Sequence, residues 1–280
     1  NGGLRSRPLL RLLDYANRRA FAAADRVIVL GSDMSDRIIA NGVAAERIAV
    51  VTDWVDCAVI RPLARNSLRE SFAGKFVVMY SGNLGLSQQL KTVLAAAERL
   101  HDDPRVLFVL IGEGARKAWL IGQAAARGRT NVRFLPYQPK ERLSESLGAA
   151  DLHLIPLNAG AAGCLVPSKV YGIMAASRPF IAMMDSESEV ARLANRHGIG
   201  SVVRPGDGAA LAAAIHDAAM CPDALSSMGI KARQFALRSF DRKIVTGKFG
   251  QVLAELGAVS FSIKTAAQDT QETHQIFAEG

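Results

Sequence analysis

The stretch that decides the fold is KFVVMYSGNLGLSQQL, at residues 75–90. Its first part, Phe76 to Tyr80, is an apolar run that predicts a buried strand. The glycines that follow predict a tight turn, and the pattern then changes to that of a helix, expected from Gln88 to Leu100. The same change of period recurs along the next ~165 residues, about the size of one domain, and it is typical of a parallel sheet covered by helices.

The alternation after this stretch divides into individual elements. Further strands are expected at Val106 to Ile111, Val132 to Phe134, Leu152 to Ile155, Phe180 to Met183 and Ser201 to Val203. Helices are expected at Ala115 to Arg127, Lys140 to Leu147, Ser168 to Ala176, Glu187 to Arg196 and Gly208 to Ala219, with two more between Asp223 and Leu256. Right-handed crossovers place the carboxyl ends of these strands at one edge of the sheet, where ligands bind in such folds.

A smaller βαβ unit precedes the main pattern. A strand from Arg26 to Leu30, a helix from Met34 to Ala40 capped by Gly31-Ser32-Asp33, and a strand from Ile48 to Val51 are expected, followed by a linker from Thr52 to Leu63. We therefore predict an α/β protein with a Rossmann-like parallel sheet and a truncated first domain. Its parts are residues 1–62, the remnant and linker; 63–240, the main domain; and 241–280, a helix and a disordered tail.

Length and composition are those of a well-packed globular protein. The 280 residues are 49% hydrophobic, and charged residues interrupt every apolar run before the ~20 residues that a membrane span needs. The chain starts at Asn1 and shows no signal peptide, so we expect a cytoplasmic protein whose sequence is incomplete at its start. Cys57, Cys164 and Cys221 are too far apart for a zinc site, and no metal site is expected.

The net charge of +8 is partly concentrated near the start of the chain. A basic amphipathic helix is predicted there, in which five arginines accompany leucines: Arg5, Arg7, Arg11, Arg18 and Arg19 with Leu9, Leu10, Leu12 and Leu13. Such a helix can lie on an anionic membrane surface, but a solvated helix whose leucines face a domain core is the commoner case and the one expected. Nucleic-acid binding is not indicated, because aromatic residues do not interleave the basic clusters.

Two glycine turns at the predicted carboxyl edge are candidates for ligand binding. The first consists of Gly82, Asn83, Leu84 and Gly85. Small residues there let the backbone approach a diphosphate, and the helix start offers unpaired N–H groups. The second contains Gly112 and Glu113, and Tyr137 follows the next strand, where its ring can meet a nucleobase. For each, a structural alternative stays open: a turn needed for steric reasons, or a tyrosine packed in the core.

A third candidate is a loop of small residues that begins at Asn158 and ends in Pro-Ser-Lys. Its candidate ligand-binding residues are Gly163, Leu165, Val166, Pro167, Ser168 and Lys169. A helix start brings N–H groups, a hydroxyl and an ammonium to one point there, and an anion is the natural occupant. Because a lysine at a helix start opposes the helix dipole, a functional role for Lys169 is favoured over a solvated charge.

Taken together, these segments resemble a known family. The motif Pro167-Ser168-Lys169 with Tyr171 and Met174, the turn from Ser81 to Gly85, and Gly206-Asp207 resemble the C-terminal domain of family 4 glycosyltransferases. The bacterial branch of exopolysaccharide, colanic-acid-type and O-antigen enzymes is the most similar. Residues 24–56 resemble the end of the N-terminal domain of these enzymes, and the resemblance extends over about residues 15–255.

The resemblance implies the two-domain GT-B fold and a retaining transfer of sugar. The donor is a UDP- or GDP-sugar, the acceptor is lipid-linked or a saccharide, the product is a cell-surface polysaccharide, and no metal or other cofactor is required. By this resemblance, Gly82 to Gly85 approach the diphosphate, Lys169 neutralises it as the catalytic cation, and the loop before Pro167 holds the sugar. Glu189 matches an acidic residue that hydrogen-bonds a ribose or sugar hydroxyl; a solvated carboxylate is the alternative.

Two other functions stay open at this point. One is a non-catalytic nucleotide-sugar-binding subunit that needs a partner chain, and the other is a nucleotide-sugar epimerase of the same fold. The epimerase needs catalytic carboxylates and a histidine in motif contexts that the sequence does not show. As it stands, the chain is expected to bind its donor but turn it over poorly, because a cleft with one wall neither excludes water nor orients an acceptor. Association with the inner face of the plasma membrane would suit a lipid-linked acceptor.

Overall fold

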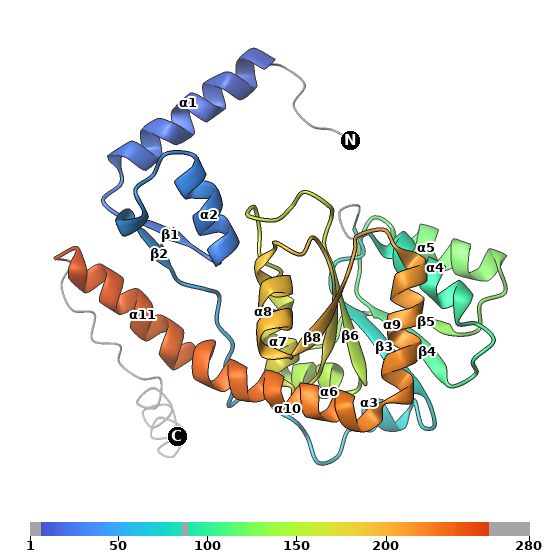
Figure 1. Ribbon diagram of the computed structural model, residues 1–280. Helices are drawn as coiled ribbons and strands as arrows, with labels where there is room; N and C mark the ends of the chain where they lie inside the picture. The colour runs from blue at the N-terminus through green and yellow to red at the C-terminus, as the bar shows by residue number, and fades with distance from the viewer. Residues whose placement is uncertain (1–6, 86–88, 258–280) are drawn as a thin grey trace, which may run out of the picture.

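The structure is a computed structural model that describes residues 7–85 and 89–257. Two separate parallel sheets organise the chain, and Figure 1 shows them side by side. The smaller sheet pairs β1 (Val27–Val29) with β2 (Ile48–Val50). The larger has six strands, so the α/β fold with a parallel sheet flanked by helices is confirmed.

The six-stranded sheet runs in the order β5-β4-β3-β6-β7-β8 with every pair parallel. Its strands are β3 (Phe76–Ser81), β4 (Val106–Ile111), β5 (Val132–Leu135), β6 (Leu152–Pro156), β7 (Phe180–Met183) and β8 (Gly200–Val203). Every residue of β4, β6 and β7 is buried, as expected for strands covered on both faces. The chain adds strands in one direction from β3 to β5 and in the opposite direction from β6 to β8. The order therefore reverses between β3 and β6.

Helices cover both faces of this sheet. On one face, α4 (Leu90–Arg99), α5 (Lys117–Ala126) and α9 (Gly208–Met220) pack against the side chains of Val78, Tyr80 and Leu110. The other face is covered by α3 (Ser67–Glu70), α6 (Leu143–Gly148), α7 (Lys169–Ala175), α8 (Glu189–His197) and α10 (Pro222–Ser239). A short 3-10 helix, Lys140–Arg142, precedes α6. No helix within residues 7–85 and 89–257 is long and apolar enough to cross a membrane.

The smaller unit consists of α1 (Arg7–Ala23), the β1–β2 pair, α2 (Ser32–Ala40) and a 3-10 helix, Ala45–Arg47. The basic helix expected near the start is present as α1. Its Leu12 is 61% exposed and Leu9 and Leu13 are also exposed, so the expectation that these leucines face a domain core is not met in the described residues. The predicted alternative, a membrane surface, stays untested.

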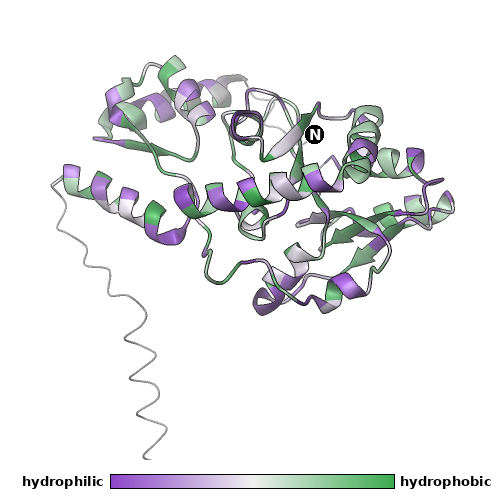
Figure 2. Ribbon diagram, turned by 60° about the horizontal axis from the view of Figure 1, so that its bottom comes forward, coloured by the Kyte–Doolittle hydropathy of each residue, from purple (hydrophilic) through white to green (hydrophobic). Residues whose placement is uncertain are grey.

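Two crossings join the units. The linker after β2 is one, and the other is α11 (Arg242–Glu255), which continues from α10 and returns to the smaller unit. Val245 and Val252 of α11 pack against Val51, forming a small apolar cluster. In Figure 2 the two long C-terminal helices alternate hydrophilic and hydrophobic residues, as helices lying on the surface of a core do.

Most expected elements are present with boundaries shifted by a few residues. Two expectations need comment. The short helix α3 was not expected, and Ser32 and Asp33 do not cap α2, because the N-cap residue is Gly31, which has no side chain. The expected disordered tail lies mainly in 258–280, outside the described residues, and the division into 1–62, 63–240 and 241–280 stays a prediction.

Candidate functional site at the carboxyl edge of the sheet

A crevice is expected where the strand order reverses, because the connections after β3 and β6 leave in opposite directions. Their pairing is short and covers only Val78 with Leu152 and Met79 with His153. The last residues of β3, Tyr80 and Ser81, extend past this pairing towards the first glycine turn. Two of the three candidate segments follow directly from these strands: residues 82–85 follow β3, and the Pro-Ser-Lys loop follows β6.

The structure brings these two segments into contact through Lys169. Lys169 is the first residue of α7, and its Nζ would lie 2.7 Å from a Cβ built on Gly82. A side chain at residue 82 would therefore displace the ammonium, and Gly82 also has a φ of +152°, which favours glycine. The sequence placed these residues in separate motifs. In the structure, the ammonium of Lys169 lies directly beside Gly82.

Tyr80 holds the ammonium in place. Its hydroxyl donates to the carbonyl oxygen of Asn83 (2.8 Å) and accepts from Lys169 Nζ (3.2 Å). Nζ also lies 4.3 Å from the centroid of the Tyr80 ring, within the range of a cation–π interaction. Because Tyr80 is only 1% exposed, its ring has little freedom to move, and it holds the Lys169 ammonium at this position. Burial raises the pKa of the Tyr80 phenol, which keeps it a neutral donor.

A second feature of Lys169 is its lack of a carboxylate partner in the part of the chain that the structure describes. Within residues 7–85 and 89–257, no carboxylate lies within ion-pair distance of its Nζ. Burial lowers the pKa of Lys169 to about 8, because a desolvated ammonium is less stable than a neutral amine. A bound anion would reverse that shift. A buried ammonium without a carboxylate partner in the described residues is typical of a site that binds an anion.

The two glycine turns are locked against each other. Gly112 has a φ of +149°, and a Cβ there would lie 1.9 Å from the carbonyl oxygen of Gly82. The N–H of Gly82 donates to the backbone carbonyl oxygen of Ile111 (2.9 Å), and the N–H of Leu84 donates to the backbone carbonyl oxygen of Glu113 (2.8 Å). The N–H groups of Gly82 and Leu84 are therefore used within the protein, and the approach of residues 82–85 to a diphosphate stays a prediction. The Leu84 side chain is fully buried, so it anchors the turn.

Glu113 and Tyr137 occupy the same edge, further from Lys169. The Glu113 carboxylate pairs with Lys117 four residues later (2.5 Å). Tyr137 is 51% exposed, so the alternative that its ring packs in the core is wrong. Its Cε1 would lie 3.5 Å from a Cβ on Gly112. An exposed aromatic ring beside a glycine turn is suited to stacking with a nucleobase.

The small-residue loop lines an open pocket to which Lys169 also contributes. This pocket has a volume of about 270 Å³ and lies between Pro156–Asn158, Ala161 and Leu165–Lys169. Val166 is buried and anchors the loop, whereas Leu165 and Ser168 are exposed. A pocket of this size next to a cation is of the scale of a hexose ring. Among residues 7–85 and 89–257, no three His, Cys, Asp or Glu side chains gather as metal ligands do.

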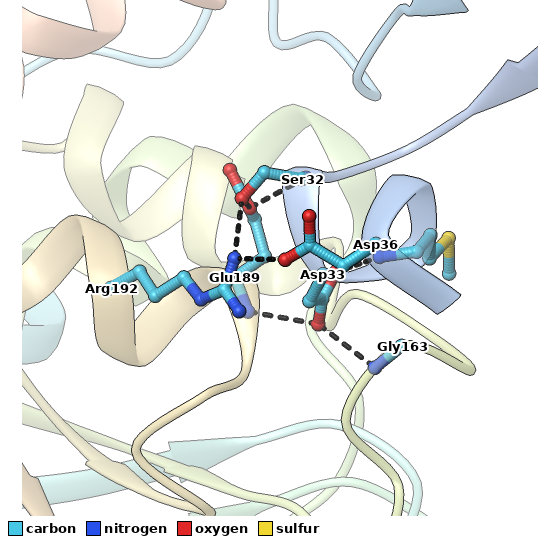
Figure 3. A network of polar contacts seen from close by, with 7 residues as sticks. Ser32, Asp33, Asp36, Gly163, Glu189 and Arg192 are labelled. Carbon is cyan, nitrogen blue, oxygen red and sulfur yellow. Dashed lines mark hydrogen bonds and ion pairs between the residues drawn. The ribbon is translucent and has the colours of Figure 1, made fainter. Parts of the chain in front are cut away.

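Glu189 lies at the start of α8 and faces the smaller unit. It is 9% exposed, so the alternative of a solvated carboxylate is wrong. Its Oε2 accepts from the N–H and the hydroxyl of Ser32 (2.8 and 2.6 Å), as Figure 3 shows. The expected contact of Glu189 with a ribose or sugar hydroxyl stays a prediction.

Sequence reasoning missed two residues of this region. Tyr80 was read only as the last residue of a buried strand, although a tyrosine at the carboxyl end of a strand is a usable signal. Asp33 was read as a cap of its own helix, but its Oδ2 accepts from the N–H groups of Gly163 (3.0 Å) and Glu189 (2.9 Å). No local pattern indicates a contact across 130 residues.

A parallel sheet of this order, with a cation and glycine turns at the reversal point, is the arrangement of an α/β domain that binds a phosphorylated nucleotide. The family model for "Glycosyl transferases group 1" matches residues 66–235. The chain therefore belongs to the group 1 glycosyl transferases. This confirms the resemblance stated from the motifs.

Individual relatives agree with this assignment. WcaI of Escherichia coli K12, which carries the name of a colanic acid biosynthesis glycosyl transferase, is 32% identical over 232 residues, covering 80% of this chain and 56% of WcaI. The glycosyltransferase WbjE of Pseudomonas aeruginosa is 28% identical over 88% of this chain and 62% of its own. This chain thus spans little more than half the length of these relatives.

Among solved structures, Anabaena HepE in complex with UDP and glucose superposes with a TM-score of 0.70 at 19% identity. The match covers 89% of this chain and 67% of HepE. At that identity the likeness concerns the fold alone, and the fold is that of GT-B glycosyltransferases.

Proposed function

We propose that this chain is the donor-binding part of a retaining glycosyltransferase that transfers a sugar from a UDP- or GDP-sugar to a lipid-linked or saccharide acceptor. The product is a cell-surface polysaccharide, and transfer needs no metal ion. Support comes from the family, from the names of WcaI and WbjE, and from UDP and glucose in HepE. We place the activity in the cytoplasm, at the inner face of the membrane where a lipid-linked acceptor is found.

One observation carries the proposal: the ammonium of Lys169, without a carboxylate partner in the described residues, is aimed at Gly82. Glycosyl transfer releases a nucleoside diphosphate, so negative charge develops on the bridging oxygen as the glycosidic bond breaks. A fixed cation stabilises this leaving group more than it stabilises the ground state. Lys169 is therefore the proposed catalytic cation. The pocket between Pro156 and Lys169 holds the sugar, and Tyr137 and Glu113 lie where the nucleoside would extend.

The experiment is nucleotide binding by isothermal titration calorimetry, with UDP and GDP titrated separately. One of the two is expected to bind, and Lys169→Ala is expected to weaken binding by about 1–3 kcal/mol, the usual loss for a charge-assisted contact. Lys75→Ala is the matched control, because Lys75 precedes β3 at the opposite edge of the sheet and its Nζ donates to Pro104. Equal losses in the two variants would refute the assigned phosphate site.

A further inference from the structure

Asp33 connects the smaller unit to two backbone positions at the carboxyl edge of the large sheet. Its side chain is 5% exposed. Oδ1 accepts from the N–H of Met34 (2.7 Å), and Oδ2 accepts from both Gly163 (3.0 Å) and Glu189 (2.9 Å), as Figure 3 shows. Gly163 belongs to the loop after β6, which continues into the lining of the 270 Å³ pocket. One carboxylate thus joins α2, this loop and the first turn of α8.

Glu189 makes the reciprocal hydrogen bond from α8 to α2. The first N–H of α2, that of Ser32, donates to Glu189, and the first N–H of α8, that of Glu189, donates to Asp33. Neither helix is capped by its own N-cap side chain, because Gly31 has none and Ser188 makes no such bond. Each helix therefore satisfies the N-terminus of the other. Two carboxylates at two helix N-termini are also favourable with respect to the helix dipoles.

Glycines allow the close approach on both sides. A Cβ on Gly31 would lie 2.8 Å from Cγ of Glu189, and one on Gly163 would lie 3.0 Å from the carbonyl oxygen of Asp33. Gly163 also has a φ of +70°, so the loop adopts a conformation there that L residues rarely take. Gly31 has an extended backbone (φ −162°), so a side chain at that position is opposed by the side chains of Glu189 and Asp33 (Oδ1 at 2.9 Å) and not by backbone strain.

Weaker polar contacts lie around the Asp33 and Glu189 carboxylates. Arg192 pairs with Asp36 (2.7 Å) and donates to the Ser32 hydroxyl (3.2 Å). Asp36 is exposed, so this ion pair is worth little by itself. Asp33 and Glu189 differ from it, because a buried carboxylate is costly unless its hydrogen bonds are made. Their hydrogen bonds exist only while α2 contacts α8. If the two helices separate, the Gly163 N–H loses its acceptor, the Asp33 carboxylate.

From this arrangement we infer that Asp33 is a positioning residue for the donor sugar. Through the N–H groups of Gly163 and Glu189, it fixes the loop at residues 158–166 whenever the smaller unit is docked. The inference rests on the proposed function in one respect, that this loop holds the sugar of the donor. Its consequence is that the acceptor-side unit sets the shape of the sugar pocket, while the nucleotide contacts around Lys169 do not depend on it.

The first test needs no ligand and uses hydrogen–deuterium exchange of the whole chain. In Asp33→Ala, amides of 158–166 and of the first turn of α8 should exchange about tenfold faster, as expected for a lost helix cap, with β3 and β4 unchanged. Asp33→Asn should restore most protection at residues 158–166 and α8, because its amide oxygen can accept from the N–H groups of Gly163 and Glu189 and only the bond from Met34 is lost. Asp36→Ala, which breaks only the exposed ion pair with Arg192, is the matched control and should exchange like the wild type.

Gly31→Ala provides an independent variant, in case Asp33→Ala unfolds. It keeps every carboxylate, but the added Cβ would lie 2.8 Å from Cγ of Glu189 and 2.9 Å from Oδ1 of Asp33. It therefore disturbs the contact between α2 and α8 and should show the same faster exchange at residues 158–166. Unchanged exchange of this loop in both Asp33→Ala and Gly31→Ala would overturn the inference.

The second test compares nucleotide with nucleotide sugar by calorimetry, using UDP with UDP-glucose and GDP with GDP-mannose. Asp33→Ala should bind the bare nucleotide within about twofold of wild type but lose about tenfold of the preference for the nucleotide sugar. A purely structural defect would weaken both ligands equally. Retention of the sugar preference despite a loosened loop would overturn the inference. If the wild type binds neither UDP nor GDP, the proposed function fails, and the exchange experiment still decides whether Asp33 holds the loop.

Discussion

Two polar regions at the carboxyl edge of the sheet differ in how their charges are satisfied. Around Asp33 and Glu189, the hydrogen bonds of buried carboxylates are made by the protein itself. Around Lys169, an ammonium rests on a tyrosine with no carboxylate nearby in the described part of the chain. A satisfied network holds parts of a protein together, whereas a charge without a counterion marks a place for a ligand. The region around Asp33 and Glu189 therefore indicates a contact that positions parts of the protein, and the region around Lys169 indicates a ligand-binding site.

The largest effect should come from the glycine turns that support the Lys169 region. Gly112→Ala places a methyl group against the Gly82 carbonyl at a positive φ. We expect the free energy of unfolding to fall by about 3 kcal/mol or more, from the clash and the backbone strain together. Urea denaturation measures this loss. Gly122→Ala is the control, because Gly122 lies in α5, where an added Cβ would meet no atom within 4 Å apart from its chain neighbours and the backbone of its own helix. Alanine there should be neutral or slightly stabilising. A stable Gly112→Ala would show that the two turns are not locked.

A pH titration should separate the two regions. Lys169 is charged below its pKa of about 8 in the free protein, and a bound diphosphate would raise that pKa. Affinity for UDP or GDP should therefore be constant below pH 8 and fall by up to about tenfold per pH unit above it, until the pKa of the complex is reached. Calorimetry of wild type and Lys169→Ala across pH 7–10 isolates this contribution as the ratio of their affinities. A ratio independent of pH would contradict the assignment, and Asp33→Ala should leave the profile unchanged.

The smallest effect should come from Tyr80→Phe. The ring stays under Lys169, but the hydroxyl that accepts from Nζ and donates to Asn83 is lost. Nucleotide binding should weaken by about 0.5–1.5 kcal/mol, the usual worth of one hydrogen bond. Tyr15→Phe, at an exposed position of α1, is the control and should bind like the wild type. A loss as large as that of Lys169→Ala would mean that Tyr80 does more than position the ammonium.

The sequence predicted the elements of the large sheet because each one has a local signal. Apolar runs such as Val106 to Ile111 and glycine turns such as Gly112 define a strand and its end without knowledge of the fold. The strand order, however, depends on which crossovers pack together. The reversal between β3 and β6, which joins Lys169 to Gly82, therefore became visible only in the structure.

The candidate site was predicted to the extent that its chemistry is local. Lys169 stood out because an ammonium at a helix start opposes the dipole, and it does lie against Gly82. Leu84 is predicted to contact the donor diphosphate, and that contact stays a prediction; its N–H donates to the carbonyl oxygen of Glu113. For Asp33 the sequence predicts a cap of its own helix, and for Glu189 it predicts a ribose or sugar contact or a solvated carboxylate. Their partners lie 130–157 residues away, and a single sequence carries no signal of that pairing.

The route of the chain between its two units has a mechanical consequence. The linker and the α10–α11 junction cross at the same place, where Val55 exchanges hydrogen bonds with Phe240 and Arg242, and the Cys57 N–H donates to Asp241. Two backbone segments that are hydrogen-bonded to each other at one point restrict how one unit can rotate relative to the other. Because Asp33 on α2 is bonded to Gly163 and Glu189, a restriction on rotation at this junction also restricts how α2 can be displaced from α8.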